Sequence, residues 1–401
     1  MAGEWAAFQF ISEFCSDFRV ARFTRWNNNF LMALRVLIVP DKFKGTLTAR
    51  QAAEAIARGW REARPQDELK LLPMSDGGDG FGEVMSDLIG AVPQTEKTVD
   101  AAHRPIDSAW WWHAPTRTAV VESARVIGLA MLPPGKYHPF ELDTHGLGDV
   151  LRAAVELGAK RCLVGIGGSA TNDGGFGVAH ALGWQFCNKH GENITRWTQL
   201  HDLSAIHPPE ISRLFDELIV AVDVQNPLLG PDGCSRVYGP QKGLTEFEFA
   251  ERCLGQLAAV LEKELHLAYA NQPGAGAAGG LGFGLMSFAG ARLEPGIDIF
   301  ARHANLGERI KDAQLVITGE GALDAQTLMG KGVGEIANLC RERGVPCLGL
   351  AGVVSEPERS QDKFKATFAI TPGLTDKASA LREPALWLER LAGQAAADWR
   401  G

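Results

Sequence analysis

The chain has 401 residues, of which 45% are hydrophobic and 22% are charged, and its formal net charge at pH 7 is −8. This length exceeds what one hydrophobic core usually supports, so we expect two domains. The acidic balance argues against a nucleic-acid-binding surface, and no stretch approaches the roughly 18 consecutive apolar residues of a transmembrane helix. Seven cysteines without a CxxC pair fit a reduced, cytoplasmic location.

The first 31 residues differ from the rest of the chain. They are rich in aromatic residues, lack the long apolar core of a signal peptide, and contain Glu4, Glu13 and Asp17, which argue against a transit peptide. Met32 stands just before the first predicted strand. We therefore interpret residues 1–31 as an N-terminal extension without function, with an amphipathic contact helix as the alternative.

An alternation of strands and helices begins at residues 34–39, a short apolar run that ends at Pro40. The turn 41–45 follows, and then a helix capped by Thr46 or Thr48 that ends at Pro65. A second strand at 69–73 leads into a glycine-rich loop. Further strands are predicted at 162–166, 315–318, 347–353 and 367–371. This order is typical of parallel sheets with helices on both faces.

The middle of the chain has a different pattern. Short strands at 98–100, 109–113 and 118–122 have little helix between them, which predicts a partly antiparallel subdomain. A strand at 218–224 and a long helix at 246–266 follow. The Ala/Gly-rich stretch 273–282 is either a flexible linker or a helix start that packs closely against a ligand or another backbone.

These elements predict an α/β protein of two α/β domains with mainly parallel sheets, one domain inserted into the other. We expect residues 32–92 and 288–401 to form the outer domain and residues 93–287 to form the inserted domain. The active-site cleft should lie between the two domains, at the C-terminal ends of strands.

Three glycine-rich segments, 75–80, 165–175 and 318–324, each follow an apolar run and carry acidic residues. Glycine lets backbone N–H groups approach an anion closely, and a carboxylate in the same loop can hold a cation or accept a proton. Phosphates with a divalent metal need that combination, so the pattern indicates phosphoryl transfer. The chain contains neither a GxxxxGK[ST] motif nor the HRD and DFG motifs of protein kinases.

The acidic candidates are placed at strand ends and helix starts. Asp76 follows a buried strand, where a surface turn is the alternative interpretation, and Asp223 ends an apolar strand. Asp173 lies where a helix begins; a neighbouring polar residue can provide the N-cap, which leaves Asp173 for a metal or a substrate hydroxyl. Glu320 and Asp324 share the last glycine-rich segment, and we expect one of them to serve the nucleotide or its metal.

The basic candidates lie in turns. Lys42 and Lys44 stand in the first strand-to-helix turn, and two ammonium groups beside a helix N-terminus form a credible anion site. Lys242 lies in a Gly/Pro-rich turn. Solvated lysines are the ordinary alternative.

Two other classes of function stay open at this point. Residues 165–170 match the GxGxxA pattern of a nicotinamide-dependent oxidoreductase, but no convincing second strand precedes Glu192, where the ribose-binding acid should stand. A non-catalytic sugar-acid sensor would need a DNA-binding or partner module, and the acidic chain offers none.

Seven blocks of the sequence, in family order, resemble the signature blocks of type I glycerate kinases and together span about Met32 to Pro372. These blocks are 41–45, 74–80, 165–175, 223–230, 239–243, 273–282 and 318–327. The chain departs from the family pattern in small ways: His145 stands where an aromatic residue is common, and Ala322 replaces a frequent arginine.

The resemblance implies a kinase that uses ATP and Mg²⁺ to phosphorylate D-glycerate at the 2-hydroxyl, giving 2-phospho-D-glycerate and ADP; a glycerate 3-kinase is the nearest alternative. We expect no nucleic-acid or membrane partner, and a homodimer stays open. In this interpretation Asp76, Asp173 and Lys44 are catalytic, Lys42, Asp223, Asn226 and Lys242 bind substrate, Gly167, Gly168, Ser169, Gly319 and Asp324 bind the nucleotide, and Asp223 and Glu320 hold the metal.

Overall fold

A computed structural model describes residues 33–210, 213–328, 332–355 and 357–400. The predicted N-terminal extension, residues 1–31, lies outside the described residues. Contacts divide the chain into residues 1–33 and residues 34–401, and the elements below all belong to the second unit.

The first sheet is parallel throughout and has the strand order β13-β12-β11-β1-β2. Its strands come from both ends of the described chain: β1 (Arg35–Pro40), β2 (Glu68–Leu71), β11 (Leu315–Leu323), β12 (Cys347–Val354) and β13 (Ala366–Thr371). Along β1, Val36 and Ile38 pack into one core cluster and Leu37 and Val39 into another. Successive side chains of a strand point to opposite faces, so both faces of this sheet are covered.

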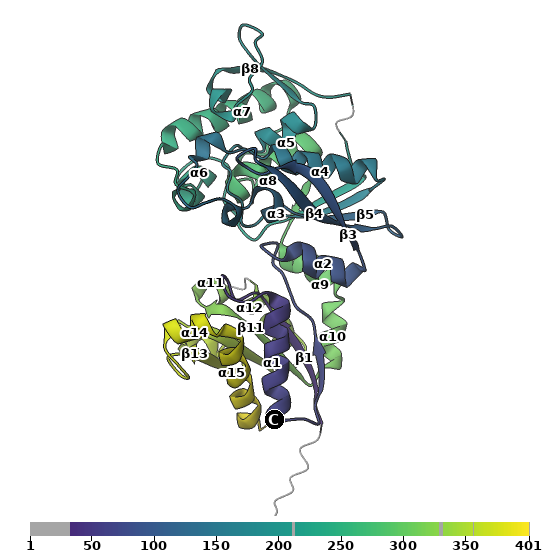
Figure 1. Ribbon diagram of the computed structural model, residues 1–401, viewed down its shortest axis with the longest axis vertical. Coiled ribbons are helices and arrows are strands. Elements are labelled where there is room, and N and C mark those ends of the chain that lie inside the picture. The colour runs from purple at the N-terminus through teal and green to yellow at the C-terminus, as the bar shows by residue number, and fades with distance from the viewer. Residues whose placement is uncertain (1–32, 211–212, 329–331, 356, 401) are drawn as a thin grey trace, which may run out of the picture. The chain divides into compact units, whose positions relative to one another are not determined.

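Helices α1 (Ala49–Ala63) and α15 (Pro384–Asp398) pack together on one face of this sheet (Figure 1). Thr48 caps α1, because its hydroxyl accepts the Gln51 amide at 3.2 Å while the Gln51 side chain accepts the Thr48 amide at 3.0 Å. Ile56 and Trp60, four positions apart, are fully buried on one side of α1. On the opposite face lie α10 (Leu306–Asp312) and α12 (Val333–Glu342).

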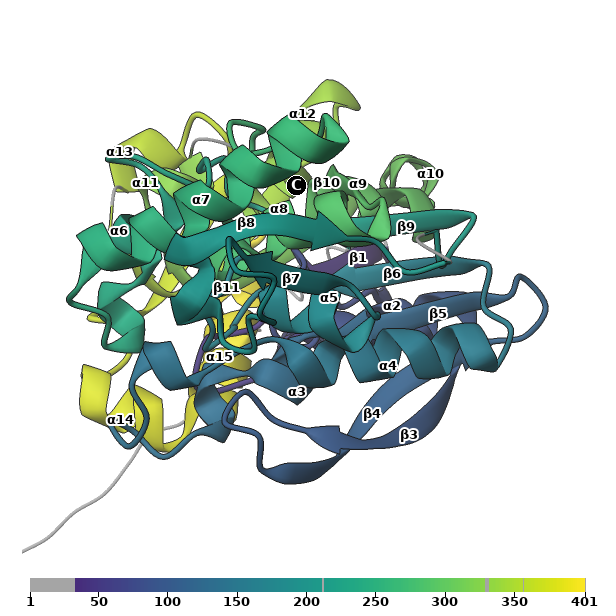
Figure 2. The same cartoon turned by 90° about the horizontal axis from the view of Figure 1, so that it is seen from above.

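The second sheet has the order β10-β9-β6-β5-β4-β3 (Figure 2). It contains β3 (Val92–Val99), β4 (Pro105–His113), β5 (Thr118–Glu122), β6 (Arg161–Gly165), β9 (Glu217–Ala221) and β10 (Arg292–Glu294). The pairs β3–β4 and β4–β5 are antiparallel and the other pairs are parallel. The predicted partly antiparallel region is therefore β3 to β5.

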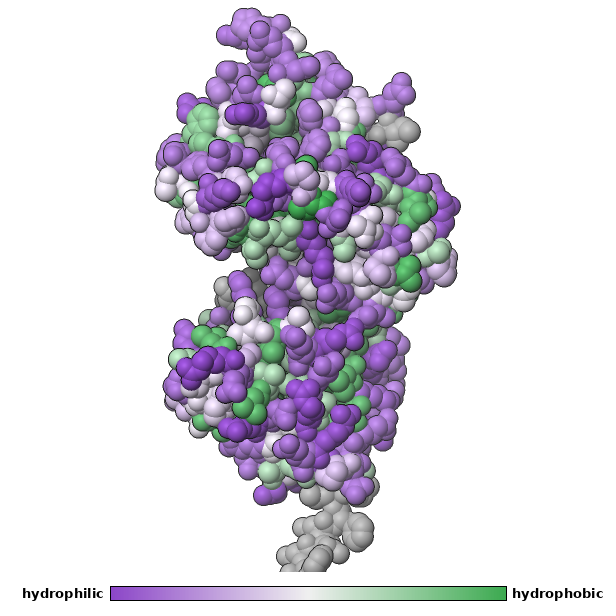
Figure 3. Space-filling model, in the orientation of Figure 1, coloured by the Kyte–Doolittle hydropathy of each residue, from purple (hydrophilic) through white to green (hydrophobic). Residues whose placement is uncertain are grey.

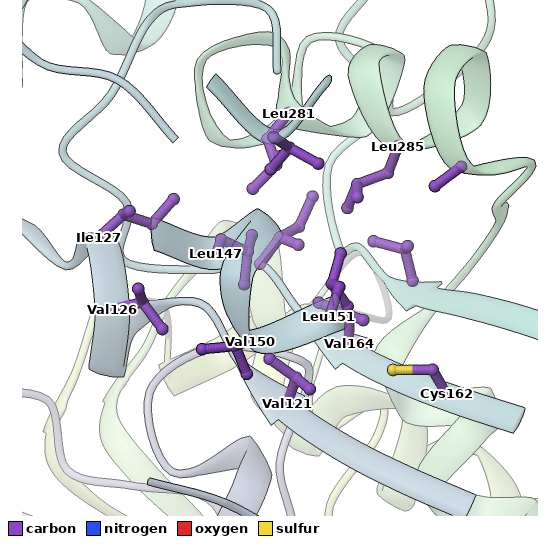
Figure 4. Packing of buried hydrophobic residues seen from close by; sticks show 14 of the residues in the cluster. Val121, Val126, Ile127, Leu147, Val150, Leu151, Cys162, Val164, Leu281 and Leu285 are labelled. Atoms are coloured by element: carbon purple, nitrogen blue, oxygen red, sulfur yellow. The ribbon is translucent and has the colours of Figure 1, made fainter. Parts of the chain in front are cut away.

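Both faces of the second sheet are also covered. One face packs against α4 (His145–Glu156) and α8 (Ala277–Ala289), and Figure 4 shows Val121 and Val164 among the Leu and Val side chains of this cluster. The other face packs against α2 (Phe81–Ile89) and α9 (Gly296–His303).

The remaining elements are short, apart from one helix. They are α3 (Ala124–Ile127), η1 (Leu129–Met131), η2 (Pro139–Glu141), α5 (Phe176–Ala181), β7 (Gln185–Asn188), η3 (Trp197–Asp202), β8 (Leu203–His207), α6 (Cys234–Tyr238), η4 (Pro240–Lys242), α7 (Phe247–Leu265), α11 (Ala325–Leu328), α13 (Pro357–Ser360) and α14 (Lys377–Arg382). Strands β7 and β8 form a separate antiparallel pair. The long helix α7 agrees with the predicted helix at 246–266.

The predicted α/β class with mainly parallel sheets is confirmed, whereas the division into an outer and an inserted domain stays a prediction. Strand β10 joins the second sheet although it lies beyond residue 287. The linker interpretation of residues 273–282 is wrong, because a Cβ on Gly279 would lie 2.0 Å from the carbonyl oxygen of Thr171. This stretch packs tightly, with left-handed backbone from Ala278 to Gly280.

The surface seen in Figure 3 is largely hydrophilic, with scattered hydrophobic residues. Within the described part of the chain, no helix combines the length and apolar character needed to cross a membrane.

Candidate active site

The loop of residues 75–80 joins β2 to α2 and carries Asp76. Left-handed backbone at Gly80 (φ +89°) starts the helix abruptly. The Gly78 amide donates to Oδ1 of Asp76 at 3.1 Å, and the two carboxylate oxygens of Glu122 accept the amides of Gly80 and Gly82 at 2.9 Å each. Glu122 ends β5, so this buried carboxylate ties the loop and the start of α2 to the second sheet.

The carboxylate of Asp76 interacts with both Lys42 and Asp223. Nζ of Lys42 is 3.5 Å from Oδ1 of Asp76, and the side chains of Asp76 and Asp223 lie close enough for each to shift the pKa of the other. The backbone amide of Gly296, the first residue of α9, acts on Asp223 and favours its ionised form. The side chain of Asp76 is 28% exposed and that of Lys42 is 20% exposed, so a small molecule can reach both.

The two aspartates carry their charge unequally. Burial raises the pKa of Asp223, and the adjacent Asp76 charge raises it further, so Asp223 holds a proton. Burial alone would raise the pKa of Asp76. The charge of Lys42, together with interactions from Asp223 and the Gly78 amide, has the larger effect and lowers this pKa. Asp76 is therefore an ionised hydrogen-bond acceptor beside a protonated carboxyl group.

Two further carboxyl groups from the first sheet act electrostatically on this pair. Burial and the charge of Asp76 raise the pKa of Asp41, which follows β1. Burial and the charge of Asp41 raise the pKa of Glu320 to about 7, although Thr327 donates to Glu320 at 2.7 Å. Like charges that repel one another in a buried site favour a proton or a bound cation.

The predicted site residues did not include Asp41 and Glu122. Both stand at the carboxyl ends of strands, as Asp223 does, so the same sequence signal could have found them.

The glycine-rich segment 165–175 lies directly against the 75–80 loop. The Gly167 amide donates to the Gly77 carbonyl at 3.2 Å, and a Cβ on Gly167 would lie 2.6 Å from Cα of Gly78. A Cβ on Gly168 would lie 2.2 Å from a carboxylate oxygen of Asp79. The two backbones can approach this closely because Gly77, Gly78 and Gly167 have no side chains. The Gly167 amide, predicted to cradle a phosphate, is already used within the protein.

Asp173 is placed differently from the prediction that it contacts a substrate hydroxyl. Its side chain has no exposed surface, and its carboxylate accepts hydrogen bonds from the Thr144 amide at 2.9 Å, the Thr144 hydroxyl at 2.7 Å, and the amides of Gly175 at 3.3 Å and Gly177 at 2.9 Å. Burial raises the pKa of Asp173 to about 6, and the charge of Asp143 contributes to this rise. A carboxylate enclosed by protein donors positions the segment and α5.

The side chains of Lys242 and Asn226 are also bound within the protein. Nζ of the buried Lys242 donates to Oγ of Ser169 at 3.1 Å and to the Thr171 carbonyl at 2.6 Å. Burial lowers the pKa of Lys242 to about 8. Asn226 donates to the Asp232 carbonyl at 2.8 Å, and its Oδ1 accepts the hydroxyl of Tyr238 at 2.6 Å. In this structure Lys242 and Asn226 stabilise loops beside the Asp76–Asp223 pair.

The third glycine-rich segment is not a loop, which corrects the prediction for residues 318–323. Strand β11 continues to Leu323 and pairs with β12 through Gly319 and Glu320. Glycine permits this because a Cβ on Gly319 would lie 2.1 Å from the carbonyl oxygen of Leu350. Asp324 follows the strand, and its Oδ1 accepts the Thr327 amide at 3.3 Å.

A cavity of about 370 Å³ opens beside Lys42 and the N-terminus of α1. Its lining combines four basic side chains with four acidic ones, namely Lys42, Lys44, Arg50 and Arg125 with Asp79, Glu83, Asp87 and Glu122. The first turn of α1 contains no acidic residue, so its positive end is not neutralised from within the helix. Lys44 and this helix end form an environment that suits an anionic group.

The carboxyl groups around Asp76 offer the oxygen donors that Mg²⁺ prefers, and their mutual repulsion fits a cation. Among the residues that the structure describes, however, no group of three or more His, Cys, Asp or Glu side chains is arranged to hold a metal ion. Mg²⁺ in phosphoryl-transfer sites usually keeps several waters and takes one or two carboxylates plus substrate phosphates, so a preformed protein cage is not required.

The chain is similar to known proteins of one family. The model of the glycerate kinase family matches residues 36–400. The chain is 37% identical to a glycerate kinase of Bacillus subtilis over 91% of this chain and 97% of that protein, and 38% identical to a glycerate 2-kinase of Escherichia coli over 80% and 86%. A crystal structure assigned as a glycerate kinase 2 from Salmonella typhimurium superposes with a TM-score of 0.78 at 32% identity, covering 91% of this chain and 98% of that one.

The chain is thus a kinase of the α/β class. It belongs to the glycerate kinase family, which confirms the resemblance seen in the sequence. The oxidoreductase alternative finds no support in the fold: after segment 165–175 and α5, the next strand β7 pairs with β8 in a two-stranded antiparallel sheet, whereas a dinucleotide fold requires it in the parallel sheet.

Proposed function

We propose that this protein transfers the terminal phosphoryl group of ATP to the 2-hydroxyl of D-glycerate, giving 2-phospho-D-glycerate and ADP, with Mg²⁺. The observation that carries the proposal is the accessible Asp76 carboxylate between Lys42 and the protonated Asp223. Family membership supports glycerate as the acceptor, and the name of the Escherichia coli relative supports the 2-hydroxyl.

In the proposed mechanism Asp76 accepts the hydrogen bond of the glycerate hydroxyl and orients its oxygen for in-line attack on the phosphorus. Lys42 keeps Asp76 ionised, because its ammonium group lies within ion-pair distance of the carboxylate. Before Mg²⁺ binds, the protonated carboxyl group of Asp223 beside Asp76 also favours the ionised form of Asp76.

Lys44 and the N-terminus of α1 are proposed to bind the carboxylate of glycerate or a phosphate of ATP in the 370 Å³ cavity. Glu320 and Asp223, the latter after losing its proton, would hold Mg²⁺, which when bound neutralises charge on the phosphates. Asp173 and Lys242 are proposed to act indirectly, by holding segment 165–175 against the Asp76 loop.

The direct test is product identification. The protein is incubated with Mg-ATP and D-glycerate, and the product is examined by proton-coupled phosphorus NMR. We expect a doublet, because phosphate on C2 couples to a single proton, and no product with L-glycerate or without glycerate. A triplet would identify 3-phosphoglycerate and therefore the alternative glycerate 3-kinase. ATP consumption that does not depend on glycerate would contradict both assignments.

A further inference from the structure

A second cavity, of about 650 Å³, lies at the end of the second sheet opposite the Asp76 site. Thr118, Arg161, Glu217 and Arg292 line it, and they are the first residues of β5, β6, β9 and β10. These four neighbouring strands are parallel, whereas Glu122 and Asp223 stand at or just beyond their carboxyl ends. A five-residue strand separates its ends by roughly 13 Å, so this cavity is distinct from the site described above.

The polar side of this cavity carries an excess of positive charge. Arg161, Arg292 and Arg302 line it together with the imidazoles of His113 and His303. The side chains of the three arginines are 60%, 63% and 51% exposed, so their guanidinium groups can reach a ligand.

Two carboxylates form ion pairs with these three guanidinium groups. Glu217 lies 3.6 Å from Arg161 and 3.2 Å from Arg292. Glu294 lies 2.6 Å from Arg292 and 2.8 Å from Arg302. One guanidinium charge is therefore left without a balancing carboxylate in this group. Guanidinium groups bind carboxylate and phosphate oxygens in a two-pronged geometry, so the cluster suits an anion with several oxygens.

The inner wall of the cavity is apolar. It is formed by Ile89, Leu163 and Ile219, and the last two belong to the core between the sheet and helices α2 and α9. A cavity of this volume is in the range of small-molecule sites, and its lining combines an apolar wall with a few convergent charged groups. Its chemistry matches a small organic anion better than a bare ion.

Helices α2 and α9 connect this cavity to the Asp76 site. Helix α2 begins directly after the 75–80 loop and ends at Ile89 on the cavity wall. Helix α9 begins at Gly296, which packs so closely against the backbone of Asp76 that a Cβ there would lie 1.8 Å from the Asp76 carbonyl oxygen, and α9 ends at Arg302 and His303 on the cavity wall. The two helices pack against each other. A ligand that moves the cavity ends of these helices therefore also acts on the elements that hold Asp76 and Asp223.

We infer that this cavity is an effector site for a small dianion, either a phosphomonoester or a dicarboxylate, and that its occupancy changes turnover at the Asp76 site. Binding is independent of the function proposed above, whereas the effect on turnover rests on it. The two ligand types share the chemistry that arginine recognises, and separate arms of the experiment distinguish them.

The binding arm titrates the full-length protein with inorganic phosphate and, separately, with malonate by isothermal calorimetry at constant ionic strength. The variant Arg161→Gln/Arg302→Gln removes two guanidinium groups from the cavity. The control Arg58→Gln removes an arginine of similar exposure, 51%, that pairs with Glu389 and does not line the cavity. Hydrogen bonds between charged partners are strong, so we expect the dissociation constant of at least one probe to rise about tenfold or more in the double variant only.

Binding of the same probe at the Asp76 site would persist in the double variant, so only the difference between the two proteins reports on this cavity. The replaced side chains are exposed, and melting temperatures check that each variant is folded. The variant Arg161→Gln/Arg302→Lys retains the charge at position 302, so it should bind the probe more tightly than the variant Arg161→Gln/Arg302→Gln. If neither probe binds the wild type, or if the double variant binds both probes as the wild type does, the site does not exist.

The kinetic arm measures kcat at saturating glycerate and Mg-ATP with increasing probe, so that substrate displaces any probe from the Asp76 site. We expect kcat to change by a factor of about two or more along the calorimetric saturation curve in the wild type and in Arg58→Gln, but not in the double variant. A kcat that stays constant while the cavity fills would contradict the coupling. If the wild type does not phosphorylate glycerate at all, the proposed function is wrong, and the binding arm alone then tests the effector site.

Discussion

Gly296→Ala should damage catalysis through the backbone of the Asp76 loop. A Cβ on Gly296 would lie 1.8 Å from the carbonyl oxygen of Asp76 and 2.8 Å from the amide nitrogen of Gly77. Contacts under 3.0 Å are essentially never tolerated, so the loop or the start of α9 must move by at least 3.0 − 1.8 = 1.2 Å. The obstructing atoms are backbone, which cannot rotate away.

A displacement of this size at a catalytic carboxylate can cost about 10²-fold in rate, and overpacking usually costs about 1–3 kcal/mol of stability. We therefore expect kcat for D-glycerate to fall about 10²-fold while the protein remains folded. A coupled assay that follows ADP formation measures the rate, and urea denaturation measures the free energy of unfolding.

The matched control is Gly255→Ala in α7, where the nearest atom to the new Cβ is Cδ1 of Leu229 at 3.7 Å, an ordinary contact. Alanine is favoured over glycine in a helix by about 1 kcal/mol, so this variant should be slightly more stable and fully active. If folded Gly296→Ala has the kcat of the wild type, the position of the 75–80 loop does not determine turnover, and our assignment of the site is wrong.

Three further variants test the supporting structure. The pKa of Lys242 falls from 10.5 to about 8 on folding, so between these pH values the unfolded chain carries the Lys242 proton and the folded protein does not. The free energy of unfolding should therefore rise by about 3 kcal/mol from pH 8 to pH 10.5, relative to the same measurement on Lys242→Met. Lowering the pH from 10.5 to 8 should reverse this gain. Denaturation at several pH values measures this difference; the control Lys311→Met removes a lysine that is 71% exposed and should show none of it. Gly279→Ala should lower the melting temperature strongly or prevent folding, since its Cβ would lie 2.0 Å from the Thr171 carbonyl oxygen, and a melting temperature within a degree or two of wild type would refute the tight packing of residues 273–282. Thr48→Ala should cost about 1 kcal/mol in urea denaturation through loss of the α1 cap, and no loss would show that this cap is dispensable.

Much of the site could be predicted because its acids follow apolar strands. In a parallel sheet, residues after neighbouring strands meet at one edge. This rule predicts a site at the end of each strand, but Asp76 follows β2 of the first sheet and Asp223 follows β9 of the second sheet. Their proximity therefore depends on how the two sheets are placed, which no strand pattern predicts. Which of the two keeps the proton could not be predicted, because it depends on Lys42 and on burial.

Other features depend on partners that are distant in sequence. The role of Asp173 is determined by Thr144, whose amide and hydroxyl both donate to it from 29 positions away. Glycine content predicted a loop at residues 318–323, but the approach of the Leu350 carbonyl makes glycine suitable for a strand there. The cavity at the amino ends of β5, β6, β9 and β10 joins four separate segments, so no local pattern reveals it.

The central claim is that the carboxylate of Asp76 orients the glycerate hydroxyl, and Asp76→Asn tests it most directly. Asparagine keeps the size of the side chain but removes the charge, and general acid–base effects of this kind are worth about 10²–10⁴-fold. The control Asp107→Asn removes an exposed carboxylate on β4. We expect kcat for D-glycerate to fall about 10²–10⁴-fold in Asp76→Asn with little change in melting temperature, and to stay at the wild-type value in Asp107→Asn. A folded Asp76→Asn protein that phosphorylates D-glycerate at the wild-type rate would contradict the account.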